Sequence, residues 1–302
     1  MESSNTKNLL MATAVVAVAF APSWAAADEH LFGYVKGAET LPKGNWELYQ
    51  WITSRADKDS GSYRAWNTST EIERGVTDRL NVAGYFRMQR IDTSGLVIDG
   101  YLPGAESYGL RPSGVEGEIK YNFRSPAIEN VGLSAVFALT YDWRDPHSGR
   151  DKDTTSIEST LIAQKYFREG QLVWAANVGL EATHADRAPI EDLPDEFEWP
   201  TDPEMEIELI GGSAFSYRFQ PNWHVGVETL YETEFETEVG QERWSLFAGP
   251  VLHYATQKWW LTFSWMSQQR GGGEQYTDQP DADLHLIEKT KDEYRLKIGL
   301  NF

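Results

Sequence analysis

Charged side chains recur at every second position along several short stretches of this 302-residue chain. Glu116, Glu118 and Lys120 form one such set, and Arg295 and Lys297 form another, with apolar or small residues between them. A period of two places alternate side chains on opposite faces of a β-strand. If such strands close into a barrel, the charged sets face the interior, where hydrated groups can bind or conduct ions.

This alternation assigns an excess of acidic side chains to the interior face. The carboxylates are Glu47, Glu71, Glu73, Glu116, Glu118, Glu158, Glu181, Glu206, Glu208 and Glu228. The cations are Arg87, Lys120, Arg218, Arg243, Arg295 and Lys297. Unpaired charge in a dry interior is very costly, so these groups must be paired or hydrated. On neighbouring strands, Glu71 and Glu73 are the expected partners of Arg87.

Two functions are compatible with an acidic lumen. One is a water-filled channel that gives passive, porin-like passage to a small solute, with a preference for cations or basic solutes. The other is a structural or surface-interaction barrel whose lumen is closed by salt bridges. Strand number alone does not decide between a filled and an open lumen. We expect the channel, without enzyme activity, cofactor or bound metal.

An outer membrane hydrolase is a third and less favoured function. It needs a Ser nucleophile and a His base within hydrogen-bond reach. His147 and Ser148 are adjacent in an expected loop, whereas two residues that share a strand face are two positions apart. His184 and Asp186 have suitable spacing but no nearby serine.

The acidic stretch 186–208 could attract calcium, but it lacks EF-hand spacing, so we expect a solvated loop.

The last nine residues predict the strand against which the others are ordered. Apolar side chains occupy every second position, at Tyr294, Leu296, Ile298, Leu300 and Phe302. This pattern resembles the C-terminal sorting strand of Gram-negative outer membrane β-barrels, which the assembly machinery reads. In such a barrel the last strand must close against the first. Closure would bring Glu47 beside Arg295 or Lys297.

The N-terminal sequence predicts export. Residues 9–20 form an apolar run after Lys7, and Ala25–Ala27 gives an A-x-A cleavage pattern, so we expect a signal peptide over residues 1–27. Residues 28–43 are then a periplasmic leader of the barrel domain 28–302, with strands from about 45 to 302. The chain has no cysteine, and its net charge of -19 disfavours nucleic acid as a partner.

Twelve stretches of alternating character follow one another along the chain. They cover about residues 45–53, 63–73, 80–88, 115–123, 133–143, 157–167, 172–182, 205–219, 223–231, 244–254, 259–265 and 294–302. Longer polar loops alternate with short turns, as in a barrel whose two termini are periplasmic. We therefore predict an all-β fold, a 12-stranded antiparallel transmembrane β-barrel preceded by a cleaved signal peptide. A soluble β-sandwich is the alternative.

Several segments resemble known outer membrane barrels. These are FGYVKGAETLPKGNWELYQW (32–51), EIERGVTDRLNVAGYF (71–86), PNWHVGVE (221–228) and FAGPVLHYATQKWW (247–260). Together they look like an uncharacterised Gram-negative outer membrane family, and the GVTDRL hairpin is similar to the "transporter" barrels linked to phenol-degradation operons. The resemblance implies an outer membrane location. Expected partners are outer membrane lipid, lipopolysaccharide and the barrel assembly machinery, with the transported solute unknown.

Overall fold

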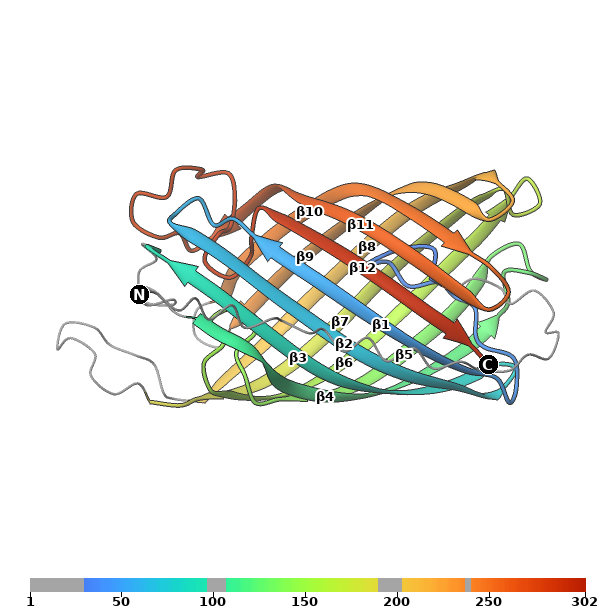
Figure 1. Cartoon of the computed structure of the whole chain (residues 1–302), viewed down its shortest axis with the longest axis horizontal. Helices are drawn as coiled ribbons and strands as arrows, with labels where there is room; N and C mark the ends of the chain where they lie inside the picture. The colour runs from blue at the N-terminus through green and yellow to red at the C-terminus, as the bar shows by residue number, and fades with distance from the viewer. Residues whose placement is uncertain (1–29, 97–106, 190–202, 237–239) are drawn as a thin grey trace, which may run out of the picture.

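The chain folds into a closed barrel of twelve antiparallel strands, as predicted (Figure 1). The computed structural model describes residues 30–96, 107–189, 203–236 and 240–302. The strands are β1 (Trp46–Ala56), β2 (Ser62–Thr77), β3 (Leu80–Ser94), β4 (Ser107–Arg124), β5 (Gly132–Asp142), β6 (Lys152–Phe167), β7 (Leu172–Arg187), β8 (Glu204–Gln220), β9 (Trp223–Glu236), β10 (Gly240–Ala255), β11 (Trp259–Gly273) and β12 (Asp292–Asn301). The predicted signal peptide lies outside the described residues. No helix of the described part is long and apolar enough to cross a membrane.

The barrel closes where the last strand pairs with the first, which confirms the predicted closure. Leu48 on β1 lies opposite Leu300 on β12. At the end of this seam, the backbone N–H of Trp46 donates to Phe302 O at 2.9 Å, and Phe302 N–H donates to Trp46 O at 3.0 Å. Every strand therefore has two hydrogen-bonded neighbours, and the sheet has no exposed edge.

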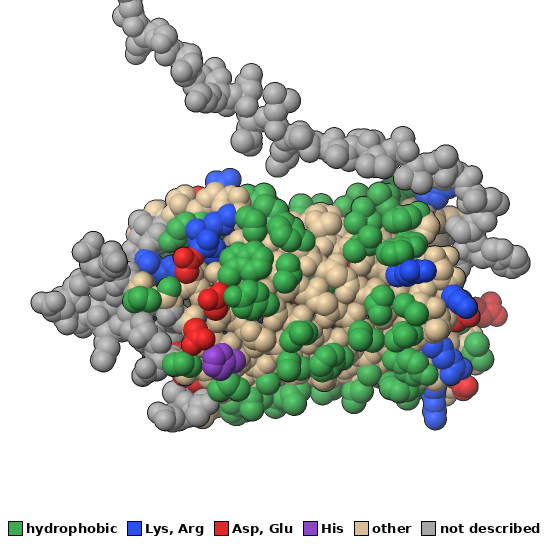
Figure 2. All heavy atoms as spheres, turned by 90° about the horizontal axis from the view of Figure 1, so that it is seen from below, with side chains coloured by type: hydrophobic (Ala, Val, Ile, Leu, Met, Phe, Trp, Pro, Cys, Tyr) green, Lys and Arg blue, Asp and Glu red, His purple; other side chains and the backbone are tan. Residues whose placement is uncertain are grey.

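The distribution of side chains is inverted relative to a soluble protein. The predicted assembly face (Tyr294, Leu296, Ile298, Leu300 and Phe302) points outward, with 37 to 56% of each side chain exposed. Figure 2 shows hydrophobic side chains across the middle of the outer surface and charged ones toward its two ends. Buried charged groups, by contrast, face the interior. An apolar band with a polar lumen is the pattern of a membrane-spanning barrel.

Several strands extend further than the alternation alone predicts. β3 has 15 residues and β4 has 18, whereas roughly 9–11 tilted residues cross a bilayer. The extra residues continue the pairing of neighbouring strands at the end of the barrel that carries the longer loops, here called the long-loop mouth. The opposite end, with the short turns and the seam at Trp46 and Phe302, is the short-turn mouth.

Residues 30–41 run inside the barrel and residues 42–44 are exposed at the short-turn mouth, which corrects the prediction of a periplasmic leader over residues 28–43. Phe32 and Val35 are buried and pack against Val173 and Val251 of the inner wall. These apolar side chains would be exposed to water in a solvated leader, whereas the lumen covers them. We call residues 30–44 the plug segment; residues 28 and 29 lie outside the described part of the chain.

A second segment enters the barrel from the long-loop mouth. Residues 274–291, here the lid loop, connect β11 to β12. Their side chains Tyr276, Leu284, Leu286 and Ile287 join Tyr63, Ala65, Ile91 and Leu96 in one buried apolar cluster. The lid loop thus docks by its own small hydrophobic core, and a cavity remains between it and the plug segment.

Candidate functional site

One row of directly paired positions crosses the inner wall of the barrel. It runs through Glu47 (β1), Glu73 (β2), Ala83 (β3), Glu118 (β4), Ala138 (β5), Glu158 (β6), Glu181 (β7), Glu208 (β8), Glu234 (β9) and Arg243 (β10). We call its carboxylates the acid row. Because barrel strands are tilted and staggered, the row is inclined. It starts near the short-turn mouth at Glu47 and reaches the long-loop mouth at Glu234.

Like charges directly opposite each other on neighbouring strands are destabilising, so the acid row requires compensation. At the long-loop mouth, Arg243 forms ion pairs with Glu234 and with Glu208, the latter at 3.7 Å. Arg243 also contacts Glu288 of the lid loop. The sequence pattern assigned Glu208 and Arg243 to the lumen but did not place Glu234 there.

Lys289 of the lid loop adds a second cation at this mouth. Its Nζ lies 2.7 Å from Glu232 and 3.7 Å from Glu208. Burial of the amine acts to lower the pKa of Lys289, but Glu232 and Glu208 together outweigh it, so this pKa is raised. The lid loop therefore brings its own charge to the wall of the lumen and stays cationic there.

Lower in the lumen, the plug segment supplies the compensating charge. Lys36 Nζ donates to Glu118 Oε2 at 2.6 Å. The backbone N–H of Lys36 donates to the side chain of Asn177 at 2.6 Å, and Asn177 donates back to Lys36 O at 2.9 Å. The lysine is thus held at its backbone by β7 while its amine reaches β4.

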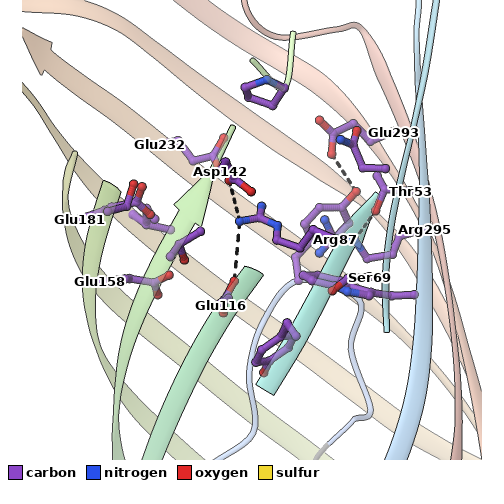
Figure 3. Close-up of a pocket in the computed structure, with 18 of the residues that line it drawn as sticks. Thr53, Ser69, Arg87, Glu116, Asp142, Glu158, Glu181, Glu232, Glu293 and Arg295 are labelled. Carbon is purple, nitrogen blue, oxygen red and sulfur yellow. Dashed lines mark hydrogen bonds and ion pairs between the residues drawn. The ribbon is translucent and has the colours of Figure 1, made fainter. Parts of the chain in front are cut away.

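Glu158 and Glu181 form the middle of the acid row. They are directly paired across β6 and β7, and Figure 3 shows them side by side. Thr160 and Thr183 donate hydroxyl hydrogen bonds to them. Among the described residues, no Lys, Arg or His nitrogen lies within 4.0 Å of either carboxylate. Arg87 and Lys36 act on this pair only from beyond ion-pair distance, so this part of the wall offers negative charge without a directly bound cation.

Arg87 is held by acidic groups other than those expected. Its guanidinium binds Asp142 at 2.9 Å and lies 3.7 Å from Glu116 (Figure 3). The predicted partners Glu71 and Glu73 are wrong. The prediction paired Arg87 of β3 with β2, whereas its guanidinium turns toward β4 and β5.

The predicted ion pair of Glu47 with Arg295 or Lys297 is also wrong. Glu47 accepts a hydrogen bond from Trp260 and lies 3.3 Å from His30 of the plug segment. Arg295 instead donates to Thr53 at 2.8 Å and to the backbone carbonyl of Gly33 at 3.1 Å. The prediction did not place residues 30–44 in the lumen, where His30 lies beside Glu47 and the carbonyl of Gly33 accepts a hydrogen bond from Arg295.

Glu228 is the main anchor of the plug segment. Its side chain is 1% exposed and accepts the backbone N–H groups of Gly33 at 2.8 Å, Tyr34 at 2.8 Å and Val35 at 3.1 Å. Ser264 adds a fourth hydrogen bond at 2.6 Å. A carboxylate with four donors is stable when buried, so Glu228 is a structural clamp in this closed arrangement.

The remaining predicted lumen residues are distributed along the barrel. Glu206 pairs with Lys152 at 3.4 Å, and Glu71 and Lys120 are buried. Arg218 is exposed, in a pair with His224 close to the turn between β8 and β9. It therefore lies at the short-turn mouth and outside the central lumen.

A cavity of about 510 Å³ separates the plug segment from the lid loop. The acid row from Glu73 onward and Arg87 line one part of its wall, whereas Tyr34, Trp51 and Arg295 line another. The Arg295 guanidinium stacks over Tyr34, 3.7 Å from the ring centre. The cavity is thus largely polar, with an acidic wall and an aromatic, cationic wall.

The lid loop is fixed by buried polar groups. Lys58 donates to the backbone carbonyls of Leu286, Ile287 and Lys289. Burial, together with the nearby positive charge of Arg55, holds the pKa of Lys58 well below its ordinary value. Opening the lid would return this amine to water.

Two histidines lie in the loops that close the long-loop mouth. Burial lowers the pKa of His285 to about 4; the nearby Glu288 opposes this shift. Burial and the positive charge of Arg55 hold the pKa of His147 well below its ordinary value. Both rings are therefore neutral while these loops are docked.

The candidate hydrolase residues form a turn. Asp145 accepts the backbone N–H groups of His147 at 2.8 Å and Ser148 at 2.6 Å. Ser148 Oγ accepts the N–H of Arg150 at 3.3 Å, and His147 Nδ1 contacts Arg55 at 3.2 Å. These contacts orient the turn, and they give no Ser–His hydrogen bond.

In the part of the chain that the structure describes, His30, Glu47 and Glu73 form one group that could hold a metal ion, with ligand atoms within 4.8 Å of one another. Glu47 already accepts a hydrogen bond from Trp260, and Glu73 accepts one from Asn81 at 2.7 Å. The arrangement therefore serves the packing of the plug segment against β1 and β2.

The comparisons with known proteins agree with this architecture. A family model described as a family of unknown function, DUF6662, matches residues 24–302. The chain belongs to the DUF6662 family. A search of curated proteins found no match to this DUF6662 chain.

Solved outer membrane barrels share the fold of the DUF6662 chain. The COG4313 outer membrane channel from Pseudomonas putida F1 is 15% identical, with a TM-score of 0.55 over 88% of this chain and 98% of that one. The NalP translocator domain from Neisseria meningitidis is 11% identical, with a TM-score of 0.52 over 88% and 90%. The beta domain of the Bordetella autotransporter BrkA is 11% identical, with a TM-score of 0.51 over 87% and 100%. The similarity to barrels of phenol-degradation operons stays a prediction.

Proposed function

We propose that this barrel is a gated channel of the outer membrane that gives passive passage to small solutes and prefers cations. The observation that carries the proposal is the acid row, which runs along the inner wall from one mouth to the other. Its middle pair, Glu158 and Glu181, faces the cavity, and no Lys, Arg or His nitrogen of the described residues lies within 4.0 Å of either carboxylate. Rings or rows of carboxylates favour cations in pores.

The arrangement described here is the closed state of that channel. The plug segment is held by Glu228, and the lid loop is held by its apolar cluster and by Lys58. Passage therefore requires one or both segments to move. Both are connecting segments held by side chains, whereas the wall is held by a continuous ladder of backbone hydrogen bonds, so they can move while the barrel stays intact.

A structural barrel is the second candidate. It is favoured by the ion pairs that fill both ends of the lumen, Lys36 with Glu118 and Arg243 with Glu234. In that case the lumen would stay closed, and any interaction with the surroundings would involve the outer surface or the loops.

The outer membrane location and assembly belong to the same proposal. The apolar outer band suits lipid, and charged ends suit the headgroups and lipopolysaccharide on the two sides (Figure 2). The outward face of β12, which resembles a sorting strand, is the feature that the barrel assembly machinery would read.

Ion entry into vesicles tests the choice between the channel and the structural barrel. The mature protein is refolded, its barrel is verified by heat-modifiable migration, and it is placed in vesicles that carry entrapped fluorophores quenched by Tl⁺ or by iodide. A channel of the proposed kind admits Tl⁺ faster than iodide. A folded barrel that admits neither ion, both as wild type and after Glu228→Ala releases the plug segment, would establish the structural barrel.

A further inference from the structure

The contact between Lys36 of the plug segment and Glu118 of the wall shows how the lumen can bind an amine. Lys36 Nζ lies 2.6 Å from Glu118, and both residues line the central cavity. The lysine side chain is 38% exposed, whereas the carboxylate is only 7% exposed. A primary ammonium therefore sits at the cavity edge on a buried carboxylate. This ammonium differs from that of a free amine solute in being covalently attached to the plug segment.

Three more carboxylates of the same cavity have no ion pair within 4.0 Å among the described residues. Glu158 and Glu181 have hydroxyl donors but no ion pair with the described residues. Glu71, which is 2% exposed, has an Oε2 atom with no hydrogen-bond partner in the described part of the chain. A buried acceptor such as Glu71 Oε2 is costly to leave unsatisfied. The three carboxylates point into a space that holds a solute-sized volume.

We propose that the cavity binds linear aliphatic diamines and that Lys36 is a tethered stand-in for one of their ammonium groups. This inference rests on the proposed channel function and names its solute class. One ammonium takes the place of Lys36 on Glu118, and the other binds between Glu158 and Glu181. The alkyl chain spans the part of the cavity between Glu118 and Glu158, which both line it.

The geometry of the sheet sets the length of the guest. Glu118 and Glu158 stand on β4 and β6, two strands apart, which corresponds to roughly 10 Å at the usual spacing between strands. An extended six-carbon diamine suits this separation better than a two-carbon one. Each ammonium has three donors, which matches the carboxylate and hydroxyl acceptors of the wall.

Calorimetric titration of the refolded mature protein in detergent tests the proposal directly. The probe is 1,6-diaminohexane, with 1,6-hexanediol, 1-aminohexane, 1,2-diaminoethane and Ca²⁺ as comparisons. Lys36→Met should raise the affinity for 1,6-diaminohexane at least tenfold, because the competing ammonium is gone. Lys43→Met is the matched control, since Lys43 belongs to the plug segment but is exposed at the mouth, and it should bind like the wild type.

Further outcomes of the titration decide the proposal. Adding Glu158→Gln and Glu181→Gln to Lys36→Met should reverse the gain. The proposal is overturned if Lys36→Met binds the diamine no more tightly than the wild type does. It is equally overturned if 1,6-hexanediol or 1,2-diaminoethane binds as tightly as 1,6-diaminohexane. It is also overturned if Lys36→Met raises the affinity for Ca²⁺ by as much, because the acid row would then bind any cation.

A measurement on the unaltered protein keeps the test decisive if Lys36→Met fails to fold. Acetylation of the wild type is followed by mass spectrometry as the ratio of label at Lys36 to label at Lys43. A bound diamine should displace the Lys36 amine and raise this ratio at least threefold, and an unchanged ratio contradicts the proposal. Neither experiment requires ion passage, so failure of diamine binding and failure of the channel are distinguishable.

Discussion

Glu228 on β9 accepts the backbone N–H of Gly33 at 2.8 Å, although 195 positions separate the two residues in sequence. The same carboxylate accepts the N–H groups of Tyr34 and Val35. One wall residue therefore fixes the plug segment at the point where it crosses the lumen. Without it, three buried donors lose their acceptor, at a cost of about 1–3 kcal/mol for each donor left unsatisfied.

Glu228→Ala should release the plug segment and leave the barrel folded. The wall is held by its own backbone hydrogen bonds, which this substitution leaves in place. Spontaneous openings in a planar bilayer should become at least several-fold more frequent than in the wild type. Glu206→Ala is the control, because the ion pair of Glu206 with Lys152 joins two wall strands. Equal opening frequencies for the two variants would show that Glu228 does not hold the gate.

The lid loop should loosen as the pH falls from 7 to 5. An undocked His285 has an ordinary pKa near 6.5, whereas the docked ring has a pKa of about 4. Between these values the docked state binds fewer protons, so acid weakens docking, by about 2 kcal/mol at pH 5 from this residue. His147, whose pKa is also lowered, acts in the same direction.

Hydrogen exchange of residues 274–291, corrected for the intrinsic effect of pH, measures this loosening. The charges that act on the pKa of His285 are Glu288, Arg243, Lys58 and Lys289. The pKa of Lys58 is also held low while the lid loop is docked, so its protonation weakens docking in the same direction as that of His285. His285→Gln should reduce the dependence on pH. Protection that is constant from pH 7 to 5 in the wild type would contradict the docked, neutral histidine.

The regular wall could be predicted from the sequence because its information is local. Alternation alone places Glu116 and Glu118 inward and Leu296 and Ile298 outward, and short turns order the strands. The pairing of Glu158 with Glu181 follows from the hairpin between β6 and β7. Register in a hairpin is fixed by its turn, so such pairs are accessible to sequence reasoning.

The plug segment and lid loop could not be predicted in the same way, because their contacts are distant in sequence. Lys36 donates a hydrogen bond to Glu118, 82 positions away in sequence, and Lys58 donates one to the carbonyl of Leu286, 228 positions away. A partial signal was present: Phe32 and Val35 are unusual in a solvated leader. Alternation reports which wall face a residue occupies, and it says nothing of a segment that enters the lumen.

Phe302→Ala should impair assembly in cells more than folding in detergent. The contacts of Phe302 that close the barrel are backbone hydrogen bonds to Trp46, which an alanine retains. Refolding yield in detergent should therefore stay within about twofold of the wild type, while the outer membrane level in cells drops several-fold. Phe219→Ala, an exposed aromatic that β8 carries near a short turn, is the control. Equal levels of the two variants in cells would remove the proposed sorting role of β12.

The reversal potential of single channels in a planar bilayer under a salt gradient tests the central claim most directly. The account predicts discrete openings with a cation-selective reversal potential in the wild type. Glu158→Gln combined with Glu181→Gln should move that potential toward zero, while Glu169→Gln in the exposed turn between β6 and β7 should leave it unchanged. Openings without selectivity, or selectivity that survives loss of both lumen carboxylates, would contradict the acid row as the ion path.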